Sequence, residues 1–553
     1  MKAGLQLYFI AMVATLISAA CATRVAPNGG AKDTSAPKVI SANPLNGATG
    51  FQGNKITLTF DEFIQLKDGG TGILISPPML VPPTVVLKGK ALQISLNQTL
   101  EPNTTYTVTI GKSVMDISEG NAFPETGFAF STGAEIDSLQ LFGVVKDAFS
   151  NQVVKDALIM LYQEQNDSLP YKQLPRYFAR SDEQGAYTIR NIKQGNYLAF
   201  ALVDANTNYL FDQPDEKIGF LAEPMRIDSV HTGPVTFRMS AEKATRQRLL
   251  KSSFELPGKV QLNYALPVNE LEIRNVQNGQ SLSFYSEMKA GDDSMSVWLK
   301  DTNADSLHLL VNSKSFGVSR TDTLHFAPGL QRKKMAMKNS KLKADTLLHL
   351  TNNLNNGKLL PNEPFTLKSN HPVRLVHPEK ISWINGKDTL RLDVSKANTV
   401  FGFSVPLNVP NTTVSKWALQ LLPGAFEDVY GLTNDSSLTN LSLFTSDDLG
   451  LLDFRVNVEK LQSPAILQLL DAKNKVLASR SLTSEPAVFE SLAAGKYSIR
   501  LIADKNNDGK WNPGRFEGRI QAEDIYYYGG EINIRAGWDL ELEWTPGEPV
   551  KLK

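Results

Sequence analysis

The stretch Ile56-Thr57-Leu58-Thr59-Phe60 places an apolar side chain at every second position. This spacing is typical of a β-strand with one buried face, because successive side chains point to opposite sides of a sheet. The same period recurs in two later runs, Leu92 to Leu96 and Tyr106 to Ile110. Turn residues such as Lys88-Gly89-Lys90 and Pro102-Asn103 separate the runs. Short alternating strands at this spacing predict a β-sandwich.

The composition bounds the rest of the chain. Its 553 residues, 42% of them hydrophobic, predict about four or five packed domains of roughly 100–150 residues each. Lysine plus arginine equals aspartate plus glutamate at 57 each, so nothing in the charge calls for nucleic acid as a partner. No apolar run after residue 20 approaches the roughly 20 residues of a spanning helix.

A resemblance to a known family begins near residue 43. In order along the chain, five segments resemble the bacterial Ig-like domain first described in surface-layer proteins: Asn43 to Gly47, Ile56 to Glu62, Leu100 to Tyr106, Asp116 to Asn121 and Phe130 to Gly133. Four later segments resemble the prealbumin-like domains of secreted bacterial proteins: Val144 to Ala148, Ala157 to Tyr162, Arg180 to Tyr187 and Gly195 to Tyr197. The second resemblance implies a scaffold module without catalytic residues of its own.

The chain also repeats itself at a constant offset of 300 residues. Gly195-Asn196-Tyr197 and Asp204 are matched by Gly495-Lys496-Tyr497 and Asp504. Upstream of the second copy, Asp428 to Gly431 echoes the segment around Asp116. We therefore expect the pair of an Ig-like and a prealbumin-like domain to occur twice, with the second Ig-like copy degenerate.

The predicted fold class is all-β, a multidomain string of Ig-like and prealbumin-like β-sandwiches after a lipoprotein signal peptide. Between the two pairs, alternating runs such as Leu307 to Val311 predict a further β domain, and Ala241 to Lys251 predicts the one helix of useful length. The expected organisation is a signal peptide over 1–20, a lipidated cysteine and tether over 21–36, an Ig-like domain over 37–134, a prealbumin-like sandwich over 137–230, a β domain of unrecognised type over 233–337, a degenerate Ig-like domain over 345–447 and a prealbumin-like sandwich over 449–547.

The N-terminal segment has the form of an export signal. Lys2 precedes a largely apolar run from Leu5 to Ala20, which is too short for a spanning helix and leads directly into Cys21, the only cysteine. It resembles a bacterial lipoprotein signal, which implies cleavage before Cys21 and a lipid, palmitate included, on that residue. Ser18 departs from the usual pattern, which has leucine there. The alternative is a signal peptide cut elsewhere that releases a soluble protein.

The residues after Cys21 predict a flexible leash. Ala22 to Ala36 contains proline and glycines and would reach on the order of 20 Å. Acidic residues after the lipidated cysteine favour surface display in some Gram-negative groups, but Ala22, Thr23 and Arg24 follow here. We therefore expect the periplasmic face of the outer membrane.

Two loops have the spacing of a calcium-binding loop. The first places oxygen-bearing side chains at positions 1, 3, 5, 9 and 12, namely Asp204, Asn206, Asn208, Asp212 and Asp215. The second has Asp504, Asn506, Asp508 and Asn512, with Gly509 at the sharp turn. Calcium takes six to eight oxygen ligands, which a short loop of this spacing can supply.

The second loop lacks a carboxylate at its twelfth position, where Arg515 stands, so Glu517 or Asp524 would have to substitute. The alternative interpretation is that Asp and Asn are good loop residues whose side chains bond their own backbone. In either loop, bound calcium would stiffen the loop and would have no catalytic role.

Other candidate sites are weaker. The six histidines are scattered singly and lack zinc-site spacing. The basic stretch from Arg332 to Lys343 is expected to be a solvated connector. Trp538, Leu540, Leu542 and Trp544 alternate and predict the core face of a last strand, although Trp511, Trp538 and Trp544 could instead stack on sugar rings.

Taken whole, the order of parts resembles an Ig-like domain-containing lipoprotein of the Bacteroidota type. The resemblance implies a non-enzymatic cell-envelope protein with a structural or protein-interaction role, and we find no nucleophile elbow and no Cys/His pair. The alternative is a glycan-binding lipoprotein of a polysaccharide uptake system. That alternative requires two exposed, coplanar aromatic rings, whereas the structural role expects Trp511, Trp538 and Trp544 to be mostly buried.

Overall fold

The computed structural model describes residues 33–547 apart from 71, 111–112, 125–126, 165, 167, 214, 231–232, 277–278, 287–292, 301–303, 316, 337–345, 361–362, 387, 392–403, 408–415, 458–463 and 483–485. The signal peptide, Cys21, the tether up to residue 32, His231 and most of the basic stretch lie outside the described residues. The chain divides into two compact units. Unit 1 comprises Met1–Lys146, Gln152–Asp212 and Ile218–Met239, and unit 2 comprises Asp147–Asn151, Gln213–Lys217 and Ser240–Lys553.

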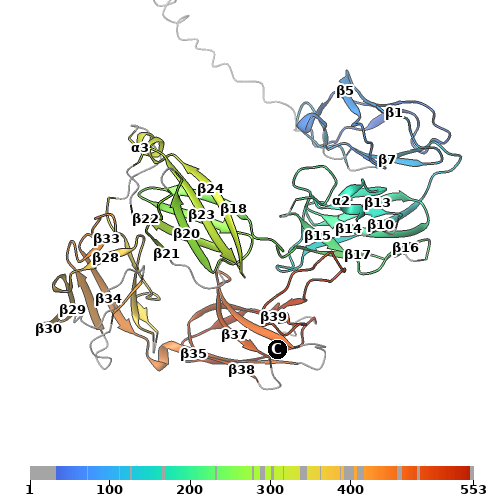
Figure 1. Cartoon of the computed structure of the whole chain (residues 1–553). Coiled ribbons are helices and arrows are strands. Elements are labelled where there is room, and N and C mark those ends of the chain that lie inside the picture. The colour runs from blue at the N-terminus through green and yellow to red at the C-terminus, as the bar shows by residue number, and fades with distance from the viewer. Residues whose placement is uncertain are drawn as a thin grey trace, which may run out of the picture. The chain divides into compact units, whose positions relative to one another are not determined.

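Unit 1 begins with a sandwich of short strands (Figure 1). These are β1 (Val39–Asn43), β2 (Lys55–Phe60), β3 (Ile64–Leu66), β4 (Leu74–Ser76), β5 (Thr84–Lys88), β6 (Ala91–Ser95), β7 (Thr105–Thr109), β8 (Val114–Asp116) and β9 (Gly127–Ser131). They form sheets of order β1-β2-β6-β5 and β4-β7-β9 and a two-stranded ladder β3-β8. The alternating residues of the three runs from Ile56, Leu92 and Tyr106 are all at most 4% exposed and share one core, so the predicted alternation of buried side chains is confirmed.

The second sandwich of unit 1 contains β10 (Leu139–Asp147), β11 (Leu158–Tyr162), the short helix α2 (Leu169–Lys172), β12 (Tyr177–Arg180), β13 (Ala186–Ile192), β14 (Gly195–Leu202), β15 (Lys217–Phe220), β16 (Met225–Ile227) and β17 (Val235–Ala241). Its strands follow the order β12-β11-β14-β15-β17-β10-β13, with β16 beside β14. Tyr187 and Tyr197, which end two of the segments that resemble prealbumin-like domains, are 3% and 0% exposed and belong to one core.

Unit 2 contains a β domain built from β18 (Leu249–Glu255), β19 (Lys259–Tyr264), β20 (Glu270–Asn275), β21 (Phe284–Ser286), β22 (Ser294–Leu299), β23 (Leu307–Ser315) and β24 (Val318–Phe326), followed by helix α3 (Pro328–Met335). Its two sheets run β18-β19-β22-β21 and β20-β23-β24 and enclose one apolar cluster.

The predicted helix from Ala241 to Lys251 is wrong. Ala241 ends β17 and Leu249 begins β18, and the residues between them are irregular. Tertiary contacts hold this link, because the Gln247 side chain donates to the carbonyl of Leu266 at 3.1 Å and accepts from the Leu266 N–H at 3.0 Å. The link lacks the apolar stripe that a helix needs to pack against a core. The helix of this region is instead α3, which contains the first basic residues of the predicted connector.

Unit 2 continues with a second set of Ig-like strands: β25 (Leu350–Asn352), β26 (Lys358–Leu359), β27 (Phe365–Ser369), β28 (Val373–Val376), β29 (Ile381–Asn385), β30 (Asp388–Arg391), β31 (Ser404–Leu407), β32 (Lys416–Leu421), β33 (Phe426–Asp428) and β34 (Ser437–Leu443). Their sheets run β25-β27-β31 and β26-β34-β32-β29-β30, with a ladder β28-β33. The pairings β25-β27-β31, β29-β32-β34 and β28-β33 repeat β1-β2-β6, β4-β7-β9 and β3-β8 of the first sandwich.

A buried aspartate closes the ladder in each of these two sandwiches. Asp116 ends β8 and is 1% exposed, and its Oδ1 accepts hydrogen bonds from the backbone of Glu119 and Gly120 at 2.7 and 2.8 Å. Burial alone would raise the pKa of Asp116, but the backbone donors from Glu119 to Asn121 outweigh it and hold that pKa below its ordinary value.

Asp428 ends β33 in the same way and is 0% exposed. Its Oδ1 accepts from the backbone of Tyr430 and Leu432, both at 2.8 Å, while its Oδ2 lies 2.8 Å from Nδ1 of the buried His371. The echo between Asp116 and Asp428 in the sequence is therefore a shared turn in which a carboxylate binds the following backbone.

The last sandwich consists of β35 (Leu449–Val456), β36 (Ala465–Asp471), β37 (Val476–Ser481), β38 (Ala487–Ala493), β39 (Gly495–Ala503), β40 (Ile525–Tyr527), β41 (Ile532–Ile534) and β42 (Asp539–Trp544). The pairings β35-β38, β36-β37, β36-β39, β39-β40 and β39-β41 match β10-β13, β11-β12, β11-β14, β14-β15 and β14-β16 of the second sandwich. The two copies of the 300-residue repeat therefore share their strand pairing as well as single residues. Among the described residues, no helix is both long and apolar enough to cross a membrane.

Candidate functional site

The two Asp/Asn loops follow equivalent strands, β14 and β39, and have the same backbone conformation. Thr207 and Tyr209 have φ of 58° and 63°, and their counterparts Asn507 and Gly509 have 57° and 78°. A left-handed backbone favours glycine, so Gly509 suits its position better than Tyr209 does. Each loop therefore has a left-handed residue at the same two positions, and the chain turns in the same way in both.

The first aspartate of each loop organises this turn. Asp204 is 8% exposed and accepts from Asn208 N at 3.2 Å and Tyr209 N at 3.0 Å. Asp504 is 2% exposed and makes the equivalent bonds with the residues four and five positions later, at 3.0 and 2.9 Å. Each carboxylate thus satisfies two backbone donors within its own loop, as the alternative interpretation of these loops expected.

The amides and carboxylates further along the loops also face one another. In the first loop, Asn206 Nδ2 and Asn208 Nδ2 donate to the two carboxylate oxygens of Asp212, at 3.1 and 2.8 Å. In the second loop, Asn512 Nδ2 lies 3.3 Å from Asn506 Oδ1 and 2.9 Å from Asp508 Oδ2. The Asn512 amide, followed by that of Asn506, holds the pKa of Asp508 below its ordinary value.

The carboxylates that the sequence suggested for the last ligand position of each loop are not the buried ones. Asp215 is exposed, whereas the next residue, Glu216, is 2% exposed and accepts from Gln213 N at 3.0 Å. After the second loop, the buried carboxylate is that of Glu523, which is 4% exposed, and not that of Glu517 or Asp524.

Glu216 and Glu523 are equivalent by strand register. Ile218 pairs with Leu202, and Ile525 pairs with Ile502, which is the residue 300 positions after Leu202. Each glutamate lies two residues before its isoleucine. Glu523 accepts from Lys505 N and Asn512 N, both at 2.8 Å, so it ties the two ends of its loop together. Different loop lengths hid this equivalence from the sequence spacing.

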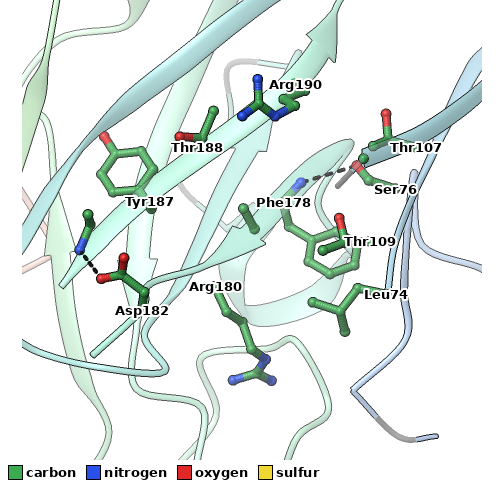
Figure 2. A pocket seen from close by; sticks show the side chains of 13 residues that line it. Leu74, Ser76, Thr107, Thr109, Phe178, Arg180, Asp182, Tyr187, Thr188 and Arg190 are labelled. Atoms are coloured by element: carbon green, nitrogen blue, oxygen red, sulfur yellow. Dashed lines mark hydrogen bonds between the residues drawn. The ribbon is translucent and has the colours of Figure 1, made fainter. Parts of the chain in front are cut away.

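The first two sandwiches meet within unit 1 at a polar cleft of about 160 Å³ (Figure 2). Residues of β4, β7, β12 and β13 line it, among them Ser76, Thr107, Arg180 and Arg190. Ser76 Oγ accepts from Phe178 N at 3.3 Å across the cleft. The volume lies below the roughly 300–1,000 Å³ of ordinary small-molecule sites.

The charged groups at the cleft are engaged with the protein itself. Arg180 Nη1 donates to the carbonyl of Asp156 at 3.0 Å, and Arg190 Nη1 donates to Gln140 Oε1 at 3.3 Å. Asp182 Oδ1 accepts the backbone N–H of Ala186 at 2.8 Å. These contacts make the cleft a polar seam between two sandwiches.

Side-chain bonds on both sides of the seam join the two sandwiches. Thr107 Oγ1 donates to Asn191 Oδ1 at 3.1 Å, and Asn191 Nδ2 donates to the carbonyl of Asp137 in the linker at 2.9 Å. Arg176 forms an ion pair with Glu101 and donates to Thr104 Oγ1 at 3.2 Å. These hydrogen bonds join the two sandwiches, which belong to the same compact unit.

The exposure of the tryptophans partly distinguishes a structural role, which expects them buried, from glycan binding, which expects exposed rings. Trp544 is 4% exposed and Trp511 is half-buried, with its Nε1 donating to the carbonyl of Glu523 at 3.0 Å. The expectation that Trp538 lies in the core is wrong: it precedes β42, is 60% exposed, and stacks under the Arg535 guanidinium at 4.9 Å. The remaining tryptophans are at most 5% exposed, namely Trp298, Trp383 and Trp417. An aromatic platform made of two exposed tryptophans is therefore not formed.

A comparison with known protein families finds a match for the N-terminal sandwich. Residues 33–132 match the family of the bacterial Ig-like domain. The match confirms the resemblance for the first sandwich and covers less than half of the chain. No curated protein matches the sequence.

Several solved structures match this chain at low identity. The TIE protein of Bacillus anthracis is 11% identical, with 94% of this chain and 76% of that chain covered and a TM-score of 0.14. BcpA, the major pilin subunit of Bacillus cereus, is 9% identical, with 74% and 98% covered and a TM-score of 0.15. The N-terminal part of the bacterial S-layer protein SbsC is 15% identical, with 37% and 43% covered and a TM-score of 0.14. TM-scores this low carry no argument about domain arrangement or function.

Proposed function

We propose that this chain is a non-enzymatic envelope lipoprotein whose β-sandwiches form a scaffold for another envelope protein. The observation that carries the proposal is the seam of unit 1, where polar side chains bind an Ig-like domain to its neighbour and leave only a small cleft. Residues committed to holding two sandwiches together serve a structural role. The bacterial Ig-like match supports the same role.

The surfaces offered to a protein partner are sheet edges. Strand β5 ends the first sheet of unit 1, and β24 and β37 end sheets of unit 2. Edge strands present backbone N–H and C=O groups that an extended segment of another protein can pair with. A glycan partner would instead have to use Trp538 without a second tryptophan beside it.

The proposed anchor is a lipid on Cys21, at the periplasmic face of the outer membrane in a bacterium of the Bacteroidota type. The support is the sequence before Cys21 and the absence of acidic residues directly after it. Acyl chains on the N-terminal cysteine would supply the two signals that stable anchoring requires.

Replacing Cys21 by serine is expected to release the protein from the membrane. The variant would lose incorporation of a labelled palmitate analogue and move to the soluble fraction, because its hydroxyl is not the thiol that lipidation modifies. Ser18→Leu, which restores the usual signal pattern, serves as a matched control and should remain membrane-bound. Unchanged membrane association of Cys21→Ser would contradict the anchor while leaving the scaffold role to be tested by partner binding.

We further propose that calcium stiffens the two Asp/Asn loops. In the second loop, Asn506 Oδ1, Asp508 Oδ2 and the carbonyl of Lys510 lie 3.3, 2.9 and 3.5 Å from one atom, Asn512 Nδ2. These are the third, fifth and seventh positions of the loop, which supply oxygens in calcium loops. A half-turn of the amide would bring the Asn512 oxygen among them.

The oxygens of this proposed site come largely from asparagines and the backbone. Among the described residues, no group of three or more histidine, cysteine, aspartate or glutamate side chains is placed to hold a metal. Lys243 Nζ also donates to Asn512 Oδ1 and would have to release it if the amide turned. These features predict weak binding, in the range of extracellular calcium modules at about 10⁻⁴–10⁻³ M.

Calcium at about 5 mM, well above that range, is expected to raise the melting temperature of the wild-type protein, because a ligand that binds only the folded state stabilises it. The rise should be halved by Asp508→Ala, which removes an oxygen from one loop only, and be absent when Asn206→Ala is added. Scanning calorimetry with calcium and with EDTA measures it. Equal melting temperatures in both buffers would reduce these loops to ordinary turns.

A further inference from the structure

Two histidines that are far apart in the sequence lie side by side in the structure. His308 on β23 and His325 on β24 are direct cross-strand partners, although 17 residues separate them. Their Nδ1 atoms are 2.6 Å apart and their ring centroids 4.7 Å apart. The distance between these two histidines along the chain conceals this pairing, which the register of β23 with β24 creates.

The register of the hairpin holds this pair on the outer face of the sheet. Leu307 and Leu309, the neighbours of His308, are 6% and 0% exposed, and Leu324 beside His325 is 8% exposed. A shift of one residue would drive those leucines into water, so the core fixes the alignment of the two imidazoles. His325 is exposed and His308 half-buried, which leaves the pair accessible to solvent.

The surroundings tolerate a cation. On the adjacent strand β20, the outward-facing Arg274 is paired with Glu272, whose Oε1 lies 2.9 Å from its Nε. Position 310, next to His308 on the same face, is a leucine, and Thr323 lies opposite it. The positive charge of Arg274 is thus compensated by Glu272.

We propose that His308 and His325 form a surface site for a divalent transition metal that prefers imidazole, such as Zn²⁺ or Cu²⁺. Two imidazole nitrogens on strands of one sheet are suitable ligands, and the other positions of the metal remain open to water or to a group from a partner.

The geometry requires a small adjustment. Nitrogen atoms about 2.0–2.1 Å from a tetrahedral zinc are about 3.3 Å apart, so the Nδ1 atoms must separate by roughly 0.7 Å from 2.6 Å. A turn of the exposed His325 ring can supply this without moving the backbone. This site is independent of the calcium loops, whose ligands are oxygens, and of the proposed anchor.

Titration calorimetry with Zn²⁺ on the full chain, purified without a histidine tag and in excess calcium, tests the site. The wild type is expected to bind with a Kd on the order of micromolar, and His308→Gln and His325→Gln should each weaken this binding at least tenfold. His377→Gln, which changes another partly exposed histidine, 3.3 Å from Glu379, is the matched control and should bind as the wild type does. Circular dichroism verifies folding, and either variant alone suffices if the other misfolds.

A second readout identifies the ligands directly. With one equivalent of Cu²⁺, the electron paramagnetic resonance spectrum should show two coordinated nitrogens in the wild type and one fewer in His325→Gln. No zinc binding by the wild type, or equal binding by both glutamine variants and the wild type, would overturn the proposal. A loss in His377→Gln equal to that in His325→Gln would do the same, because it would show adventitious binding to scattered histidines.

Discussion

Alanine in place of Gly143 is expected to destabilise the second sandwich of unit 1 by about 3 kcal/mol, at the upper end of the usual cost of overpacking. Gly143 lies in the middle of β10, next to β17 in the sheet order. A Cβ at this position would lie 1.8 Å from the carbonyl oxygen of Val235 and 2.8 Å from its nitrogen. The clash is with backbone, which cannot turn aside as a flexible side chain can.

The clash would also break a hydrogen bond in the core. The hydroxyl of Tyr187 donates to the same Val235 carbonyl at 3.0 Å, so moving that carbonyl leaves a buried hydroxyl without its acceptor. Amide hydrogen exchange in peptides from β10 and β17 should therefore be faster by about two orders of magnitude, at 1.4 kcal/mol per factor of ten.

Gly233→Ala is the matched control, because a Cβ there meets nothing within 4 Å. It should change stability by less than about 0.5 kcal/mol. If both variants exchange at the wild-type rate, the close approach of β10 to β17 is not present in solution.

Alanine in place of Trp383 is expected to destabilise the second Ig-like sandwich by about 3–5 kcal/mol, because it opens a large cavity. Trp383 is 1% exposed on β29 and packs edge-on against Phe365 at 5.6 Å between ring centroids. Both belong to the cluster that forms the core of this sandwich.

Phenylalanine at position 383 should cost less than half as much. The indole Nε1 of Trp383 is buried without a hydrogen-bond partner among the described residues, so phenylalanine removes an unpaired donor as well as some volume. Amide hydrogen exchange in peptides from β29 and β32 compares the stability of this sandwich in the two variants, independently of the other domains of the chain. An alanine variant as protected as the phenylalanine variant would show that Trp383 is not a core residue.

Alternation and turn residues predicted the strands well. Ile56, Leu58 and Phe60 lie in the core as expected, because period two reflects the geometry of a strand itself. The repeat of Gly195 and Asp204 at Gly495 and Asp504 likewise predicted two sandwiches with the same strand pairing.

The error between Ala241 and Lys251 has a physical cause. Local composition permits a helix there, but the neighbouring strands β17 and β18 and the hydrogen bonds of Gln247 with Leu266 decide the conformation. Tertiary contacts override weak helix propensity when the segment has no apolar face of its own to bury.

What the sequence by itself determined is local: the strand period, the turns and the front halves of the Asp/Asn loops. Only the tertiary structure decided which distant residues meet. Glu523 was brought to its loop by the register of β39 with β40, and His308 was brought to His325 by that of β23 with β24. The reason is that side chains on neighbouring strands meet according to register, which the whole core sets and no single stretch of sequence encodes.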